Sequence, residues 1–226
     1  EGLGTPTPGS IGGEWMVIGL VRSGRETPDA YYDNAVKFVQ ENIDENERLH
    51  RAKSTENSRM ILALTALGKD VTNVGGHNLL SGLTDMAYVR KQGINGPIWA
   101  LIAFDSGNYP IPEGGDVTRE ALIQVILDAQ LSDGGWALSG STSDADITGM
   151  ALQALAPYYK TDAKVRAAVD EALETLAVMQ EADGSFGSID GVSAESVAQV
   201  VAGLSALGID AHTDARFIKN GVSAID

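Results

Sequence analysis

Two kinds of helical pattern alternate along this chain. The segment 145–157 has apolar residues on nearly every side of a helix, which predicts a helix with protein on all flanks. The next segment, 163–179, has Val165, Val169 and Leu173 on one face and charged residues on the other. That pattern is typical of a helix that covers a core on one side only. We therefore expect interior helices of the first kind to be surrounded by outer helices of the second.

The same alternation runs through the whole sequence and predicts an all-α fold without significant sheet. The last outer segment has only a short helix near 214–219, so we expect the chain to stop before a final hairpin is complete. The expected interior helices are 14–22, 56–67, 96–106, 145–157 and 194–207. The expected outer helices are 28–43, 79–90, 118–130 and 163–179.

A loop motif recurs together with this helical pattern. The loops 130–136 (QLSDGGW) and 180–186 (QEADGSF) both have Gln first, Asp fourth and an aromatic residue last. Each loop precedes an apolar interior helix, so the chain contains an internal repeat whose unit is a helical hairpin. We interpret Trp136 and Phe186 as packing residues that hold an outer helix against the next interior one.

These loops and the Ala/Leu-rich helices after them resemble the repeats of terpene cyclases and protein prenyltransferases. The resemblance implies an α/α toroid of about five helical hairpins, with inner helices ringed by outer ones. It implies a single toroid domain over 14–226, and the Gly- and Pro-rich segment 1–13 (EGLGTPTPGSIGG) is typical of a linker. The segment 95–159 is also similar to the repeat domain of uncharacterised surface proteins of Gram-positive gut bacteria, which implies a secreted or wall-attached protein. Since one scaffold supports several chemistries, the resemblance is specific for fold rather than function.

Composition narrows the possible functions. The 226 residues include no cysteine, which excludes disulfides, thiolate nucleophiles and thiolate metal sites. Lys and Arg number 16 against 31 Asp and Glu, and the net charge of −15 opposes binding to nucleic acid and to anionic membranes. No apolar run reaches the roughly 20 residues that a membrane helix needs. We expect a monomer without membrane insertion.

Asp144 to Ile147 (DADI) is similar to the DxDD motif of class II terpene cyclases, whose central Asp protonates an alkene. Ile147 stands where the last acid would be, and its absence weakens the arrangement that makes such a carboxyl group a strong acid. We favour helix capping by Asp144 and a favourable position for Asp146 at the positive end of the helix dipole. A cyclase-like or lyase-like enzyme that uses Asp144 and Asp146 stays an alternative.

Protein prenyltransferases hold a catalytic zinc with Asp, Cys and His side chains. The matching positions here are about Asp146, Thr148 and Ser196, and only the first is a metal-ligand type. The three histidines lie in separate outer loops, where surface roles are expected; they are His50, His77 and His212. We predict no catalytic metal and no cofactor.

With these catalytic sites excluded, the sequence predicts a helical scaffold with a cavity. Its interior helices begin with short polar side chains and unpaired backbone N–H groups. Such groups suit hydrogen-bonding recognition, so we predict a non-catalytic module that binds a polar small molecule or a partner. Similarity to the helical domain of cobalamin carriers makes a corrinoid one candidate ligand, and a glycan is another. The remaining alternative is a structural spacer or adhesin segment. The candidate ligand-binding residues are Asn57, Arg59, Asn95, Trp99, Asp144, Asp146, Thr148, Glu195, Ser196 and Gln199.

Overall fold

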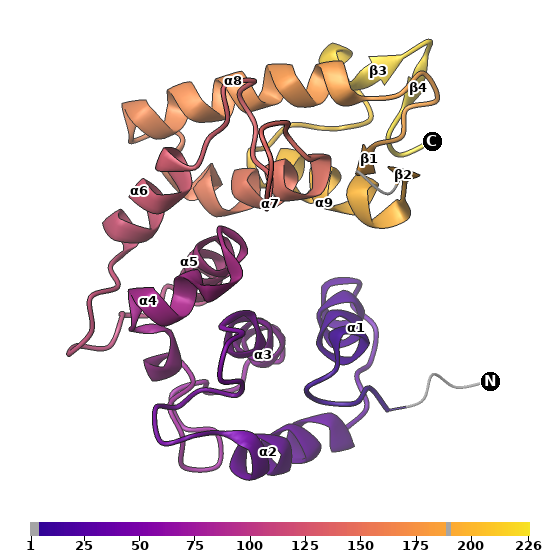
Figure 1. Ribbon diagram of the computed structural model, residues 1–226. Helices are drawn as coiled ribbons and strands as arrows, with labels where there is room; N and C mark the ends of the chain where they lie inside the picture. The colour runs from indigo at the N-terminus through magenta and orange to yellow at the C-terminus, as the bar shows by residue number, and fades with distance from the viewer. Residues whose placement is uncertain (1–4, 189–190) are drawn as a thin grey trace. The chain divides into compact units, whose positions relative to one another are not determined.

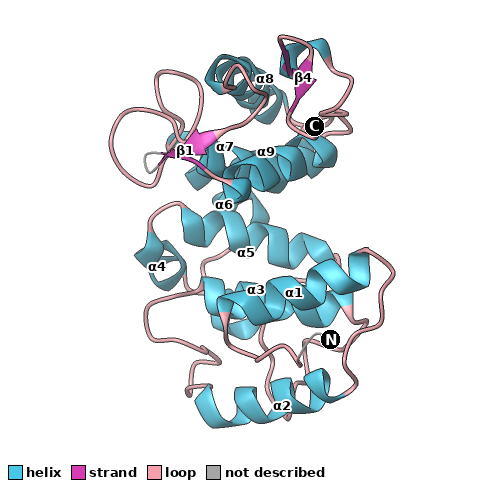
Figure 2. Cartoon of the chain, turned by 90° about the vertical axis from the view of Figure 1, so that its right-hand side faces the viewer, coloured by secondary structure: helices cyan, strands magenta, loops and turns pink. Residues whose placement is uncertain are grey.

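The computed structural model describes residues 5–188 and 191–226. Helices dominate these residues, and their strands form only two short two-stranded ribbons (Figure 1, Figure 2). The predicted all-α fold class is therefore confirmed. The chain divides into two compact units, unit 1 (Glu1–Arg119) and unit 2 (Glu120–Asp226), which are described separately. The prediction of one toroid domain stays a prediction.

Unit 1 is built on three helices of 12 residues each, α1 (Ile11–Arg22), α3 (Thr55–Ala66) and α5 (Asn95–Ser106). α3 packs against both α1 and α5, and α2 (Ala30–Asn42) lies along the outside of this layer (Figure 1). α5 is buried on nearly every side, as its apolar pattern predicts. The expected interior helices of this unit are thus present, close to their expected ranges.

Two expectations for unit 1 need correction at its helix ends. The linker expected over 1–13 is wrong at its end, because the Ser10 side chain accepts a hydrogen bond from the Gly13 N–H and caps α1 at Ile11. The single outer helix expected over 79–90 is also wrong. It is replaced by η1 (Ser81–Leu83), α4 (Met86–Val89) and η2 (Arg90–Gln92). Asp85 interrupts the helix, because it takes an extended backbone conformation and caps Tyr88 instead.

Unit 2 contains α6 (Arg119–Asp128), which begins at the boundary between the units, α7 (Ala145–Leu155), α8 (Ala163–Met179) and α9 (Ala194–Ala206). α7 packs against both α8 and α9. The α7–α9 contact is close because it is made by glycines: a Cβ on Gly149 would lie 2.7 Å from the backbone of Gln199. These four helices match the expected ranges closely.

The remaining elements of unit 2 are short: η3 (Ala156–Tyr158), β1 (Gly187–Ser188), β2 (Gly191–Val192), η4 (Ala215–Phe217), β3 (Ile218–Lys219) and β4 (Val222–Ser223). β1 pairs with β2 and β3 with β4, both antiparallel. The short helix expected over 214–219 is only partly correct, since a single 3-10 turn gives way to the β3–β4 hairpin. Asn220 and Gly221 both have positive φ angles, the geometry that favours such a tight hairpin turn.

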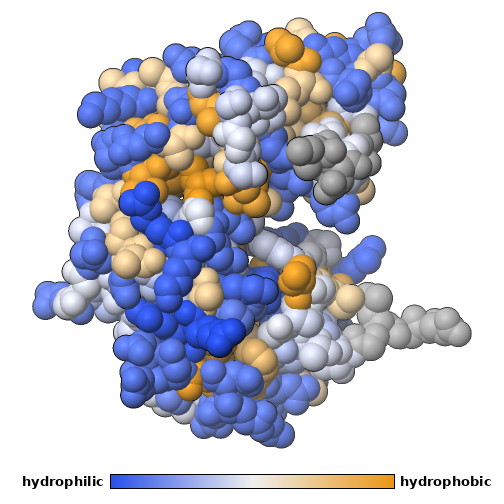
Figure 3. All heavy atoms as spheres, in the orientation of Figure 1, coloured by the Kyte–Doolittle hydropathy of each residue, from blue (hydrophilic) through white to orange (hydrophobic). Residues whose placement is uncertain are grey.

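Hydrophilic residues cover most of the face shown in Figure 3, as the composition predicts. Within the described ranges, no helix combines the length and apolar character needed to cross a membrane.

Candidate functional site

A buried charge cluster joins the starts of α1 and α3. Glu14 on α1 is only 1% exposed, and its carboxylate accepts a hydrogen bond from the Arg59 Nε on α3 at 2.9 Å. The hydroxyl of Tyr31 on α2 and the Gly9 N–H donate to its other oxygen, at 3.1 and 2.7 Å. Arg59 also pairs with Glu56 one turn earlier on α3. Every charged group in this cluster therefore has a partner, which a buried charge requires.

Tyr31 stays a hydrogen-bond donor in this cluster. Its burial is the largest cause that raises the pKa of its hydroxyl well above the ordinary value, followed by the negative charge of Glu14 and the hydrogen bond to it. The positive charge of Arg59 acts in the opposite direction but is weaker. Because the phenol keeps its proton, Tyr31 donates to the Glu14 side chain beside the cationic Arg59.

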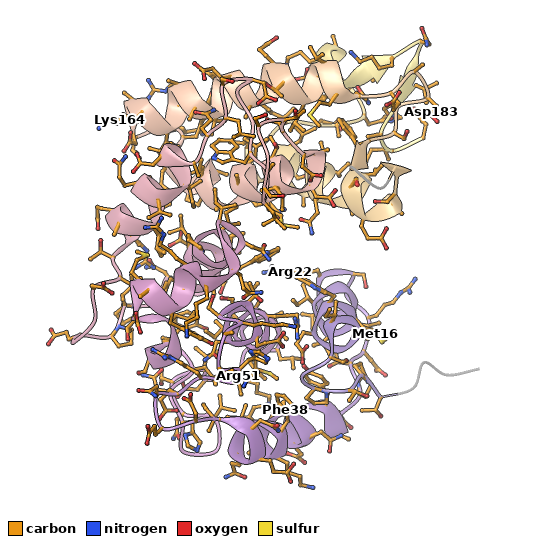
Figure 4. The ribbon with its side chains drawn as sticks, in the orientation of Figure 1. Met16, Arg22, Phe38, Arg51, Lys164 and Asp183 are labelled. Carbon is orange, nitrogen blue, oxygen red and sulfur yellow. The ribbon has the colours of Figure 1, made fainter. Side chains whose placement is uncertain are left out.

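Two tryptophans meet beside this cluster. Trp15 on α1 and Trp99 on α5 have ring centroids 5.1 Å apart at an interplanar angle of 60°, a favourable aromatic contact. Trp99 is 8% exposed, whereas Trp15 is 37% exposed and presents part of its ring to solvent. Met16 follows on α1 and points away from α3 (Figure 4). The partly exposed ring of Trp15 is therefore held in place by the buried ring of Trp99.

The contacts of unit 1 join helix start to helix start. Glu14 joins α1 to α3 through Arg59, and the Thr55 hydroxyl at the start of α3 donates to the Gln92 side chain just before α5, at 3.0 Å. The three helices thus run in the same direction with their N-termini together. Asn95 lies in the first turn of α5, and its Oδ1 is buried without a hydrogen-bond partner in the described part of the chain. A buried acceptor without a partner costs free energy unless a ligand or water satisfies it.

Asn57, predicted to bind a ligand, has a structural position instead. It is fully buried, and its Oδ1 accepts a hydrogen bond from the Leu49 N–H at 2.9 Å. Its Nδ2 donates to the carbonyls of Glu47 and Leu79 at 2.7 and 3.1 Å. Both ends of the amide are therefore used to hold loops against α3, and we exclude Asn57 from the proposed site.

In unit 2 the repeated loop motif is a backbone clamp. The Gln130 Nε2 donates to the carbonyls of Gly134 and Ala168, at 2.7 and 2.9 Å. The Gln180 Nε2 makes the same pair of bonds to Gly184 and Phe217, both at 2.9 Å. Each glutamine therefore closes its own loop and bonds it to a later element of the chain. That element is α8 for Gln130 and η4 for Gln180.

The aromatic residues of these loops are packing residues, as predicted. Trp136 and Phe186 are both fully buried. The indole N–H of Trp136 donates to the Ile126 carbonyl of α6 at 2.7 Å, and its backbone N–H donates to the Thr148 hydroxyl of α7 at 3.0 Å. Trp136 thus fastens an outer helix to the next interior one.

Several predicted site residues at the starts of α7 and α9 also have structural roles. The Asp144 side chain accepts hydrogen bonds from the N–H groups of Asp146 and Ile147, so it caps α7 as expected. Thr148 is buried against the loop at Trp136, and Ser196 is buried with its N–H bonded to the capping side chain of Ser193.

Three other predicted residues of unit 2 keep polar atoms that these clamps do not use. Asp146 has a buried Oδ1 without a hydrogen-bond partner among the described residues. Gln199 on α9 accepts a hydrogen bond from the Gln153 Nε2 of α7 at 2.8 Å, and Glu195 is exposed. These three groups are acidic or neutral, and no aromatic ring contact accompanies them in the described part of unit 2.

The histidines lie apart, as expected. The His50 Nδ1 accepts hydrogen bonds from the N–H groups of Ala52 and Lys53, whereas His77 lies beside Glu47 and His212 beside Ser223. Across residues 5–188 and 191–226, no group of three or more potential ligands is placed to hold a metal ion.

Comparisons with protein-family models, with curated proteins and with solved structures found no match to this chain.

Proposed function

We propose that this chain is a non-catalytic binding module that holds a sugar ring of a glycan at the N-terminal ends of α1, α3 and α5. The observation that carries the proposal is the exposed ring of Trp15, fixed against the buried ring of Trp99. A pyranose ring offers an apolar C–H face to an aromatic side chain and hydroxyl groups at its edge.

Binding fits this site better than turnover. The charged groups of the cluster are already paired with one another, and Glu14 is too deeply buried to meet a substrate. A general acid or base must reach the proton that it transfers, within hydrogen-bond distance of the reacting group. The cluster instead fixes α1, which carries Trp15, to α3, and a site that is rigid before binding loses less entropy when a ligand binds.

We further propose that the two units are arcs of one α/α toroid in a secreted or cell-surface protein. Support comes from the parallel interior helices of unit 1 and from the repeated clamp that joins successive hairpins in unit 2. Small-angle X-ray scattering checks the toroid: we expect the profile of one curved particle that lacks its final hairpin. A profile of two separate lobes joined by a hinge would contradict this arrangement.

The glycan site is tested by calorimetric titration with cell-wall glycan fragments and, as a comparison, with a corrinoid. Replacing Trp15 by Ala should weaken glycan binding at least tenfold, about 1.4 kcal/mol, because the stacking surface is lost. Ile11→Ala is the matched control, since Ile11 is an apolar residue of the same helix and is 71% exposed. Unchanged glycan affinity in Trp15→Ala would exclude this site, and corrinoid binding alone would replace the glycan as ligand.

The enzyme alternative has one observation in its favour, the unpartnered Asp146 Oδ1. Product analysis after incubation with polyprenyl substrates tests it in wild type and in Asp146→Asn. We expect no product in either protein. Product from wild type that disappears in Asp146→Asn would establish catalysis in place of simple binding.

A further inference from the structure

A group of exposed basic residues lies on unit 1, just before the starts of α3 and α5. We call it the basic surface and define it as Arg51, Lys53, Arg90 and Lys91. All four side chains are exposed, and none forms an ion pair within the described part of the chain. Arg51 is labelled in Figure 4, and the most hydrophilic spheres of Figure 3 run over α4, next to these residues. Four of the chain's 16 Lys and Arg residues are thus concentrated in two short segments.

The two segments are held together by a series of contacts. The Tyr88 hydroxyl donates to the His50 carbonyl at 2.6 Å, and the Ser54 hydroxyl to the Val89 carbonyl at 3.3 Å. The Lys91 Nζ donates to the Arg51 carbonyl at 3.3 Å. The basic surface is therefore a fixed arrangement, and a ligand would not have to assemble it.

The ring of Tyr88 contacts two cations in this region. Its ring is buried, with the Arg48 guanidinium 4.1 Å and the Lys91 ammonium 5.6 Å from its centroid. Both cations are therefore attracted to the ring face. Burial is the largest cause that raises the pKa of Tyr88 to about 12, so the ring stays neutral at physiological pH.

Three acidic groups near the basic surface have partners of their own. Asp85 pairs with Arg48 at 2.8 Å, and Glu56 pairs with Arg59. Asp44 accepts hydrogen bonds from the N–H groups of Asn46 and Arg48. More distant acids are screened over about 8 Å at physiological ionic strength, so the positive charge dominates locally in spite of the net charge of −15.

We propose that the basic surface binds a flexible phosphodiester chain that carries no bases, such as a polyol phosphate. One arginine guanidinium group can donate two parallel hydrogen bonds to the oxygens of one phosphate group. Arg51 and Arg90 lie in the two joined segments, so each can bind a phosphate group of the chain. Its residues differ from the two tryptophans of the proposed glycan site. Its ligand is anionic, whereas the proposed glycan site takes a neutral sugar.

Two other anionic partners fit the basic surface less well. A single-stranded nucleic acid needs aromatic rings on which its bases stack, but Tyr88 is buried under the cations. A flat anionic membrane would bring the exposed acids nearby, such as Glu41 and Glu45, against its own charge. A thin flexible chain can follow the basic surface and avoid these acids.

The test is calorimetric titration of the whole chain with an oligomer of glycerol phosphate at 50 and 200 mM salt. Wild type should bind at low salt and lose affinity as salt increases. The double variant Arg51→Gln/Arg90→Gln should bind at least tenfold more weakly. Its slope of log affinity against log salt should be shallower by about 1.4, since each phosphate contact contributes about 0.7. Arg22→Gln/Arg25→Gln is the matched control, because these two arginines are also exposed and their loss changes the net charge equally.

Unchanged affinity in Arg51→Gln/Arg90→Gln, or an equal loss in the control variant, would overturn the proposal. So would failure of wild type to bind the oligomer at 50 mM salt. Tighter binding to a single-stranded oligonucleotide or to phosphatidylserine vesicles than to the glycerol phosphate oligomer would assign the basic surface to that partner instead. Thermal unfolding of each variant confirms that the fold is retained, and none of these outcomes depends on whether Trp15 binds a glycan.

Discussion

The two units fix the starts of their interior helices by different means. Unit 1 uses long-range charge and ring contacts, namely Glu14 with Arg59 and Trp15 with Trp99. Unit 2 uses neutral bonds from side chain to backbone, repeated in the clamps of Gln130 and Gln180. As a result, unit 1 presents an aromatic ring at these helix ends, whereas unit 2 presents carboxylates and amides. One type of helical hairpin can therefore carry very different surface chemistry, depending on how its ends are fastened.

This difference is the basis for proposing the glycan site in unit 1. Each clamp uses its amide N–H groups on backbone carbonyls. The charge cluster of unit 1 pairs its charged groups with one another and leaves the neighbouring Trp15 exposed. The comparison predicts that the two units respond differently to substitution.

The largest effect is expected from breaking the buried ion pair of unit 1. Replacing Arg59 by Ala should lower the free energy of unfolding by about 3–5 kcal/mol, because Glu14 and Glu56 lose their shared cation and Glu14 stays buried. Chemical denaturation measures this loss. The control in unit 2 is Arg216→Ala, whose pair with Asp214 is more exposed and should contribute at most about 1 kcal/mol. Equal effects of the two substitutions would remove the contrast between the units.

A comparable but purely apolar effect is expected in unit 2. Leu155 on α7 is fully buried, and Leu155→Ala should cost about 2–5 kcal/mol of unfolding free energy through lost burial and a cavity. Val178 is 85% exposed on α8, so Val178→Ala should cost less than about 0.5 kcal/mol. Denaturation curves of both variants check the assignment of inner and outer layers. A negligible cost for Leu155→Ala would mean that α7 is not an interior helix.

The clamps of unit 2 should each have a smaller effect. Gln180→Met keeps the volume of the side chain but leaves the carbonyls of Gly184 and Phe217 without its donor, at a cost of about 1–3 kcal/mol. Gln130→Met should cost less, because Gln130 is less deeply buried and water can replace its amide. Denaturation midpoints compare the two variants. The reverse order of stability would show that burial does not set the strength of the clamp.

The smallest effect concerns pH. Burial raises the pKa of Asp133, but hydrogen bonds from the Ser143 hydroxyl and N–H outweigh it, so the pKa is below the ordinary value of 3.8. The carboxylate therefore stabilises the fold at pH values above its unfolded pKa, and this contribution is lost as pH falls through the lower folded pKa. Wild type should be more stable than Asp133→Asn at pH 7, and the difference should shrink in acid. A difference that grows below pH 3.8 would contradict this assignment.

The sequence predicts the interior helices well because an apolar residue on every side of a helix requires burial wherever it occurs. It fails at 79–90, where apolar residues at 79, 80, 83 and 89 suggest a helix but Asp85 caps a new turn. Local propensity for capping overrides the longer periodicity there. The clamps at 130–136 and 180–186 were recognisable because the motif is repeated, although the partners of the glutamines were not.

The candidate site was predictable only in part. Arg59, Asn95 and Trp99 follow from their positions at helix starts. For Trp15 the sequence leaves two roles open, core residue or lining of the hollow, and Glu14 was missed as a site residue. Their signal was present as a single acid in the otherwise apolar segment 11–21 and a single Arg in the interior segment 56–67. The basic surface was hidden for another reason. The charge-rich segment 41–53 is typical of a solvated turn and loop. Only the tertiary fold brings Arg51 and Lys53 close to Arg90 and Lys91.

The glutamine clamps of unit 2 also couple local opening of one segment to that of another. Each amide donates forward along the chain, from Gln130 to Ala168 and from Gln180 to Phe217, so each loop depends on a later segment. In stacked repeats each unit is stabilised mainly by its neighbours. Loss of the turn at 215–217 would therefore loosen the loop at 180–186. Movement of α8 would in the same way loosen the loop at 130–136, so hydrogen exchange in each loop should follow that of the segment that accepts its bond.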